Sequence, residues 1–509
     1  MDMRLEQREI RPEQPCGRCT AQFNVDGDVT LPGSLRETAH ILHVSAMAVA
    51  ESAEAMQDRA SVAGRVVFRV LYTQGENKQP TSIEATADFN HLCDLPGALP
   101  RTEVFACVQA EHAEAVVQGG RMNLRAVVRL WARAMGNESL AVITQVDAPG
   151  VQQRTEQLRL RTTVGRGSAD VLLREEFSLP SELAVQETLG AGAQAVFFDT
   201  AGGQGRIGLS GEVTIEAVHA SAIPGKPIVV TRHSLPVSQS VEISGENGEL
   251  LDGRIVVKDV AVASQDMGDG ERTLRAEVLL GLTAWAEREE TAALLADAYT
   301  TEGEALQLHR RNAVMRTGSR RMQAAESGKV TLMLPGDEKP LRTVLAAFAV
   351  PVMTGFTQQG SRLIAEGVME ATLLYLSEDG ETPLSVRLEA PFRTAFAAEA
   401  APDDIVTLQA ANVEAVPITS DRAELRYILR AEVEGVQAAP VTVIDDVTAV
   451  PAEPTETGIV LCYAQPGETL WEIARRYRIP EAELRNLNPE LQDQPKAGQG
   501  VLVWRRTSL

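Results

Sequence analysis

The chain has 509 residues and a formal net charge of −22, because 48 Lys and Arg stand against 70 Asp and Glu. This negative charge repels phosphate backbones and anionic lipids, so it argues against nucleic acid as a partner. A single hydrophobic core seldom serves more than about 100–200 residues, so the length indicates three or four domains.

The N-terminal sequence MDMRLEQREIRPEQ is charged and contains no apolar segment like that of a secretory signal. We therefore expect the chain to stay in the cytosol. The longest apolar run, residues 344–350, is much shorter than the roughly 20 residues of a membrane-spanning helix, so we expect no direct transmembrane span. The cysteine number is odd, which favours reduced thiols over a disulfide framework: Cys16, Cys19, Cys93, Cys107 and Cys462.

A possible metal site comes first along the chain. Cys16 and Cys19 are followed by His40 and His43, which makes four potential zinc ligands. The gap between the two pairs is longer than in a zinc finger, and both histidines lie in an apolar stretch. The spacing therefore favours no metal site.

Three sequence markers recur in the same order at intervals of about 150 residues, within the usual size range of one domain. The first is a Leu-Pro pair that ends a strand-like stretch, at residues 31–32, 179–180 and 334–335. The second is a glycine that precedes an alternating strand, at Gly64, Gly211 and Gly367. The third is a Leu-Arg pair inside a strand, at residues 124–125, 274–275 and 425–426.

These markers indicate three copies of one domain. Apolar and polar residues alternate in the glycine-led strands, which predicts antiparallel sheets with one buried face. The fold class expected is mainly β, with three repeated β-sandwich-like domains at 20–150, 170–290 and 328–438. The charged stretches between the copies, such as residues 300–329, are candidates for helical connectors.

Two further segments of this region have simple interpretations. The sequence FFDTAGGQG at residues 197–205 resembles a GTPase switch, but the chain lacks a phosphate-binding loop, so a glycine-rich hairpin is favoured. Residues 439–457 are rich in proline and acids and contain no aromatic residue, which predicts an extended linker.

The tail is close to neutral, with seven Lys and Arg against six Asp and Glu in residues 459–509. Thr469 and Glu472 have the spacing of a capping box, which predicts a helix start. A second helix is expected over EAELRNL (481–487), between the strands IVLCYA (459–464) and VLVW (501–504). The helical periodicity places four side chains on one core-facing side: Leu470, Ile473, Ala474 and Tyr477. The expected fold is a small α+β (βααβ) domain over 458–506.

This tail resembles the LysM domain over residues 459–504. The resemblance rests on P-G-E-T-L-W-x-I-A-x-x-Y at residues 466–477, followed by Asn488-Pro489 and Gly498-Gln499. It implies a binding groove with Gly467, Glu468, Thr469 and Leu470 on one wall, and with Asn488 and Pro489 on the other. Trp471 lies off the apolar stripe, so we expect it to be an exposed contact. Glu468, Cys462 and Ala464 depart from the usual LysM pattern.

No catalytic signature is found in the sequence, and a hydrolase hidden in the repeats would need a nucleophile or paired carboxylates converging in a pocket. We therefore expect no enzyme and no cofactor.

Repeated β domains followed by a LysM domain resemble the SipL-like spore coat morphogenetic proteins, which carry SPOCS domains. The resemblance implies a noncatalytic scaffold in the mother-cell cytosol, at the outer forespore membrane. Its LysM domain would bind SpoIVA, a coat ATPase. The alternative is a cell-wall protein whose LysM domain holds peptidoglycan or other N-acetylglucosamine polymers.

Overall fold

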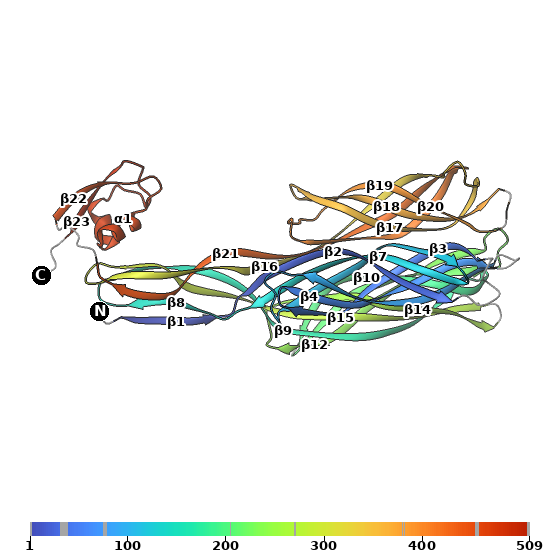
Figure 1. Ribbon diagram of the computed structural model, residues 1–509, viewed down its shortest axis with the longest axis horizontal. Coiled ribbons are helices and arrows are strands. Elements are labelled where there is room, and N and C mark those ends of the chain that lie inside the picture. Colours follow the sequence, from blue (N-terminus) through green and yellow to red (C-terminus); the bar gives the residue numbers. More distant parts are fainter. Residues whose placement is uncertain are drawn as a thin grey trace.

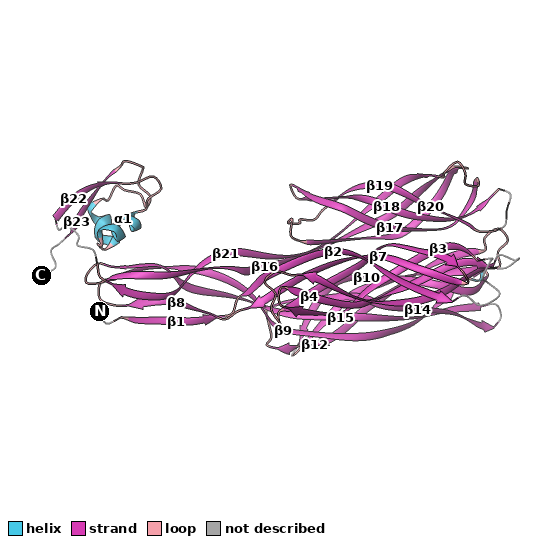
Figure 2. Cartoon of the chain, viewed as in Figure 1, coloured by secondary structure: helices cyan, strands magenta, loops and turns pink. Residues whose placement is uncertain are grey.

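The computed structural model describes residues 3–30, 39–74, 79–203, 205–268, 271–378, 380, 382–452 and 458–505. Nearly all described elements are antiparallel strands, and the α-helices of this part of the chain lie in the C-terminal domain (Figure 2). The expected mainly-β fold class with a small α+β domain is confirmed.

The first sandwich consists of two facing three-stranded sheets, β2-β7-β6 and β3-β4-β5. Val66, Phe68, Leu124 and Val128 fill the space between them. The strands are β2 (Glu13–Thr30), β3 (His40–Met56), β4 (Arg59–Gln74), β5 (Gln79–Asp94), β6 (Glu103–Gln118) and β7 (Arg121–Asn137).

The second sandwich repeats this design with sheets β10-β11-β12 and β13-β9-β15-β14. Strand β11 alternates buried and partly exposed residues over most of its length, as the sequence pattern predicts. The elements are β9 (Val151–Leu179), the 3-10 turn η1 (Ser181–Leu183), β10 (Val185–Gly203), β11 (Arg206–Ser221), β12 (Ile228–Glu242), β13 (Ser244–Gly245), β14 (Leu250–Gly268) and β15 (Glu271–Thr300).

The third sandwich has sheets β16-β21-β20 and β17-β18-β19. Its core includes Phe392, Phe396, Leu425 and Leu429. The strands are β16 (Ala305–Met333), β17 (Leu341–Gln359), β18 (Arg362–Ser377), β19 (Leu384–Phe396), β20 (Ile405–Thr419) and β21 (Arg422–Val450).

The recurring glycine has the same structural role in all three sandwiches. Gly64, Gly211 and Gly367 each lie opposite a point where the register of the neighbouring strand shifts by one residue. A Cβ atom at any of them would collide with a backbone carbonyl oxygen of that bulged strand, from Val49, Val196 or Val352 respectively. Glycine therefore permits the bulge in each of these sheets, and a bulge bends the strand that carries it.

The leucines of the other two markers lie in the cores wherever the structure describes them. Leu124, Leu274 and Leu425 are buried in the central strands β7, β15 and β21. Leu179 and Leu334 are buried where β9 and β16 end, whereas the first Leu-Pro pair, at 31–32, lies outside the described residues.

The long strands continue beyond the sandwiches and form a stalk (Figure 1). The stalk consists of three antiparallel pairs. They are β1 (Arg4–Ile10) with β8 (Leu140–Asp147), the start of β9 with the end of β15, and the start of β16 with the end of β21. Each pair contributes to a thin apolar core, for example Ile10, Leu160, Leu294, Met315 and Val443.

The stalk corrects two predictions. Residues 305–329 belong to strand β16 and are not a helical connector. Residues 439–450, expected to be part of a linker, continue β21 and pair with the start of β16. The stalk core is narrow, so these segments bury few residues there: Val443, Ile444 and Val447 in 439–450, and Met315 and Arg316 in 305–316.

A buried ionic network joins β2, β9, β15 and β16 near the start of the first sandwich. Arg316 of β16 forms ion pairs with Glu13 of β2 and Glu287 of β15. Glu13 also accepts a hydrogen bond from the backbone amide of Thr163, at 2.7 Å. Because a buried charge is costly without its partner, this network holds these four strands in position relative to one another.

The three sandwiches also meet in one shared apolar cluster. It contains Leu42 and Leu71 from the first, Leu189 and Ile228 from the second, and Leu374 from the third. The three domains therefore form a packed body at one end of the molecule, and the stalk extends from it.

Candidate functional site

The C-terminal domain has the predicted order of strand, helix, helix, strand. Its elements are β22 (Gly458–Tyr463), α1 (Leu470–Tyr477), α2 (Glu481–Leu487) and β23 (Gly500–Arg505). The two strands pair antiparallel, and the apolar faces of the two helices pack on one side of this sheet.

The predicted capping box starts α1. The Thr469 hydroxyl accepts a hydrogen bond from the Glu472 amide, and the Glu472 carboxylate accepts one from the Thr469 amide at 2.7 Å. These bonds to Thr469 hold the pKa of Glu472 below its ordinary value. The helix start is thereby fixed, and with it the loop that leads into it.

The two loops proposed as groove walls are joined by hydrogen bonds. Gln494 donates through Nε2 to the Gly467 carbonyl at 2.9 Å, and the Leu470 amide donates to the Asp493 carbonyl at 2.9 Å. Gly467 has a φ of +80°, a backbone conformation that glycine adopts without strain. Gln494 was not predicted, because no LysM motif position marks it.

The predicted groove residues differ in what they expose. Gly467 and Pro489 are exposed, and Glu468 and Thr469 are partly exposed. Leu470 is fully buried in the domain core, so it supports the groove wall from behind.

Asn488 is a structural residue. Its side chain is buried, and Nδ2 donates to the carbonyls of Leu484 and Leu502 at 2.8 Å each. Its Oδ1 accepts a hydrogen bond from the Leu502 amide at 2.8 Å. Asn488 therefore links the end of α2 to β23 and leaves its neighbour Pro489 at the surface.

Trp471 corrects the expectation of an exposed contact. Only 6% of this residue is exposed, because its ring packs edge-on against Tyr299 at the end of β15, with ring centroids 4.8 Å apart. Its Nε1 donates to Asp297 at 2.8 Å, and the Arg154 guanidinium lies 4.6 Å from its ring centroid. Trp471 thus anchors the C-terminal domain to the stalk. The domain lies near the end of the stalk that is away from the sandwiches (Figure 1).

Further polar contacts strengthen this attachment. The Tyr299 hydroxyl donates to the Ile479 carbonyl at 2.8 Å, and burial raises the pKa of Tyr299 above its ordinary value. Arg154 pairs with Glu481 at 2.9 Å. Arg478 donates to the carbonyls of Thr300 and Gly303, both at 2.9 Å. The residues outside the C-terminal domain, namely Arg154, Tyr299, Thr300 and Gly303, were not predicted, because nothing in their local sequence marks them as partners of a distant domain.

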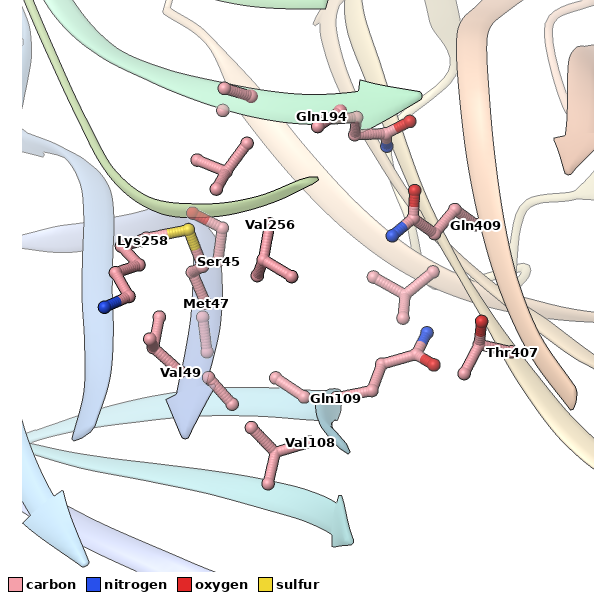
Figure 3. Close-up of a pocket in the computed structure, with 18 of the residues that line it drawn as sticks. Ser45, Met47, Val49, Val108, Gln109, Gln194, Val256, Lys258, Thr407 and Gln409 are labelled. Carbon is pink, nitrogen blue, oxygen red and sulfur yellow. The ribbon is translucent and has the colours of Figure 1, made fainter. Parts of the chain in front are cut away.

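A cavity of about 1060 Å³ lies among the three sandwiches, with lining residues from all of them. Gln109, Gln194 and Gln409 are among the side chains that surround it (Figure 3). Charged groups of its lining are paired with one another or with nearby residues: Arg232 with Glu216 at 2.7 Å, and Lys258 with Asp170 at 2.6 Å. The cavity wall is therefore nearly balanced in charge where these pairs lie.

Within the described part of the chain, no group of three or more His, Cys, Asp and Glu side chains has an arrangement that could hold a metal ion. Cys16, Cys19, His40 and His43 accordingly form no such group. His43 instead stacks on Phe348, with ring centroids 4.0 Å apart.

Comparison with known proteins identifies two domain families. Residues 38–118 match the family model described as SipL, SPOCS domain, and residues 464–504 match the LysM domain model. The chain carries a SPOCS domain and a LysM domain. This confirms the resemblance expected from the sequence, and both families are noncatalytic binding modules. No curated protein and no solved structure matches the chain.

The SPOCS match covers β3 to β6 of the first sandwich, and the LysM match covers α1, α2 and most of β23. These matches support a sporulation protein with a domain of the peptidoglycan-binding type. Among the helices described, none is long and apolar enough to span a membrane.

Proposed function

We propose that this protein is a noncatalytic scaffold of sporulation, which anchors the basal coat layer around the forespore by binding a SpoIVA-like coat ATPase through its LysM domain. One observation carries the proposal: a SPOCS domain and a LysM domain occur in one chain, and the LysM domain lies at the end of a stalk, away from the body. This position presents the domain to a partner that the body does not touch.

In this proposal the second and third sandwiches are further SPOCS domains. The support is their common strand arrangement and the bulge that each builds around an equivalent glycine, at Gly64, Gly211 and Gly367. The residues that match the SPOCS family model, 38–118, lie in the first sandwich.

The proposed binding site is the groove between the loop before α1 and the loop after α2. Gly467, Glu468, Thr469 and Pro489 would contact the partner, while Leu470 and Asn488 hold the two walls in place. Trp471 would act indirectly, because it holds the domain on the stalk.

The proposed location is the mother-cell cytosol, at the outer forespore membrane. A chain with a net charge of −22 is repelled by anionic lipid, so attachment to that membrane would depend on the coat protein.

The second candidate function is binding of peptidoglycan or another N-acetylglucosamine polymer in the cell wall. It is favoured by the type of domain and by the exposed groove, where the Gln494 amide and backbone groups near Gly467 could hydrogen-bond a sugar.

A binding titration of the full chain against purified SpoIVA and, in parallel, against chitin oligosaccharides separates the two functions. We expect saturable SpoIVA binding that weakens at least about tenfold, or about 1.4 kcal/mol, in Pro489→Asp. The control is Pro100→Asp, at an exposed proline of the body, which should bind as the unchanged chain does. Sugar binding without SpoIVA binding would favour the cell-wall function, and binding of neither would refute both.

A further inference from the structure

The sheet of the LysM domain is apolar on both faces. Its inner face, which includes Cys462, Val501 and Val503, is buried against the helices. Its outer face carries five large apolar side chains that remain substantially exposed: Ile459 at 73%, Leu461 at 59%, Tyr463 at 63%, Leu502 at 37% and Trp504 at 40%. We call these five residues the outer LysM face.

These side chains form one continuous patch. In the antiparallel register Ile459 lies opposite Trp504, and Leu461 lies opposite Leu502. Side chains directly opposite each other on neighbouring strands are about 4.5–5.5 Å apart at Cβ, so they cover the face without a polar gap.

The sequence pattern indicates that this face is normally covered. A strand with one solvated face alternates apolar and polar residues, whereas a continuous apolar run is typical of a strand buried on both faces. Both IVLCY and VLVW are continuous apolar runs. In β11 of the second sandwich, by contrast, Glu212, Thr214 and Glu216 alternate with buried Val213 and Ile215.

The contact with the stalk does not cover the outer LysM face. The stalk contacts Trp471, Arg475 and Arg478, which belong to α1 or directly follow it. Helix α1 lies on the side of the domain nearer the stalk (Figure 1). The contact therefore leaves Ile459, Leu461 and Tyr463 of this face largely exposed in a single chain.

We infer that the outer LysM face binds the same face of a second copy of this chain and forms a symmetric dimer. A face-to-face contact about a twofold axis brings the same patch of each copy together, and two sheet faces pack about 10 Å apart. The face itself is uncharged, and among the residues of β22 and β23 only Arg505 carries a charge.

The charge distribution of the whole chain is compatible with a second copy as the partner of this face. Residues 458–505 contain six Lys and Arg and six Asp and Glu, so nearly all of the net charge of −22 lies in the body and stalk. Because the LysM domain lies at one end of the molecule, a dimer joined there places the two bodies far apart (Figure 1). Charges separated by much more than the Debye length of about 8 Å are screened, so the acidic bodies do not oppose the contact.

The size of the patch predicts a weak, reversible dimer. Five such side chains cover roughly 500 Å², the upper range of single exposed patches on monomeric proteins. A stable interface buries about 800 Å² on each partner, so we expect a dissociation constant in the micromolar range. Chains held together on a coat surface would still dimerise, because their effective concentration there is high.

Analytical ultracentrifugation of the full chain from about 1 to about 100 μM tests the inference. We expect a concentration-dependent shift from monomer to dimer, and small-angle X-ray scattering should show an end-to-end particle. Leu461→Asp should raise the dissociation constant at least tenfold. Phe198→Asp is the matched control, because Phe198 is 61% exposed on the body.

Folding of the variants is checked separately. Ile459→Thr combined with Tyr463→Thr replaces two outer side chains with a strand-compatible residue and should weaken the dimer as Leu461→Asp does. The inference is overturned if the unchanged chain stays monomeric at the highest concentration, if the folded variants dimerise normally, or if Phe198→Asp abolishes the dimer. It is also overturned if a monomeric chain cosediments with phosphatidylglycerol vesicles through this face, because the occupant would then be a lipid surface. The assay contains no coat protein, so its outcome is independent of the proposed function.

Discussion

His43 illustrates how a residue acquires its properties from packing between domains. It lies on β3 of the first sandwich and stacks on Phe348 of β17 in the third. Burial lowers its pKa to about 3, and the charge of Arg387 acts in the same direction. The sequence shows a histidine in an apolar stretch, but the burial depends on a partner about 300 residues away.

The shifted pKa of His43 predicts a loss of stability in mild acid. The folded state keeps His43 neutral, whereas in the unfolded state it binds a proton below about pH 6.5. Its contribution is therefore complete above about pH 6.5 and is lost as the pH falls toward 3, by up to about 1.4 kcal/mol per pH unit. Thermal unfolding between about pH 7 and pH 4.5 should show a shallower loss for His43→Leu than for the unchanged chain.

The control for this prediction is His40→Leu, on the same strand, because His40 is exposed. It should keep the pH dependence of the unchanged chain. His219, whose pKa burial lowers to about 4, remains in every variant and sets a common background. Equal slopes for His43→Leu and the unchanged chain would contradict the argument.

The groove shows which site residues a sequence pattern can predict. The capping box of Thr469 and Glu472 is local, so its two hydrogen bonds were predictable from spacing alone. Trp471 was misjudged because helical periodicity describes only the core of its own domain. The position of its side chain depends on Tyr299 and Asp297 of the stalk, which periodicity does not reveal.

At the scale of elements, the alternation of apolar residues predicted the strands of the sandwiches but not those of the stalk. Between Ala365 and Leu373 of β18 every second residue is buried, so the period of two is visible in the sequence there. Of the first twelve residues of β16, only Met315 and Arg316 are buried. A strand that shares a thin core with five others buries few side chains. Its sequence therefore lacks the alternation of apolar and polar residues and resembles that of a polar connector.

The bulge glycines make a direct prediction at this scale. Gly64→Ala places a Cβ against the Val49 carbonyl and the Phe89 ring, so the bulge between β3 and β4 must shift. We expect a loss of about 1–3 kcal/mol in the stability of the first sandwich, the usual cost of overpacking. Chemical denaturation of the full chain measures it.

A strand glycine with open space around it is the matched control. Gly192 lies within β10, and nothing lies within 4 Å of a Cβ built there. Gly192→Ala should therefore leave stability within about 0.5 kcal/mol of the unchanged chain. Equal effects of the two substitutions would show that the bulge does not require glycine.

At the scale of the whole molecule, the attachment of the LysM domain to the stalk is the main departure from the sequence prediction. An extended linker over 439–457 was expected, but the strand continues to Val450 and the domain is held by Trp471, Arg475 and Arg478. This attachment could not be predicted from composition. It depends on the length of β15 and on the contacts between the end of β15 and α1.

Removing the central acceptor of this contact should release the domain. Asp297→Ala removes the partner of the Trp471 indole and of Arg475, which are 2.8 and 2.7 Å away. An indole left without its acceptor in a buried site costs about 1–3 kcal/mol, so we expect Trp471 to become exposed. The tryptophan emission should shift to longer wavelength, and small-angle scattering should show a broader particle.

The control for release is Asp94→Ala, because the Asp94 side chain is 83% exposed and lies on the body. It should leave the emission and the scattering unchanged. An Asp297→Ala protein with the scattering profile of the unchanged chain would mean that the remaining contacts of Tyr299 and Arg478 suffice.

The central claim is that the LysM domain recruits the protein to the coat layer, while the body folds without it. The most direct test follows a fluorescent fusion of the chain lacking residues 459–509 in sporulating cells, beside the intact chain. We predict that the truncated protein accumulates as a folded β protein but is dispersed in the mother cell, whereas the intact chain surrounds the forespore. Retention of the truncated protein at the forespore surface would contradict the claim and assign recruitment to the sandwiches.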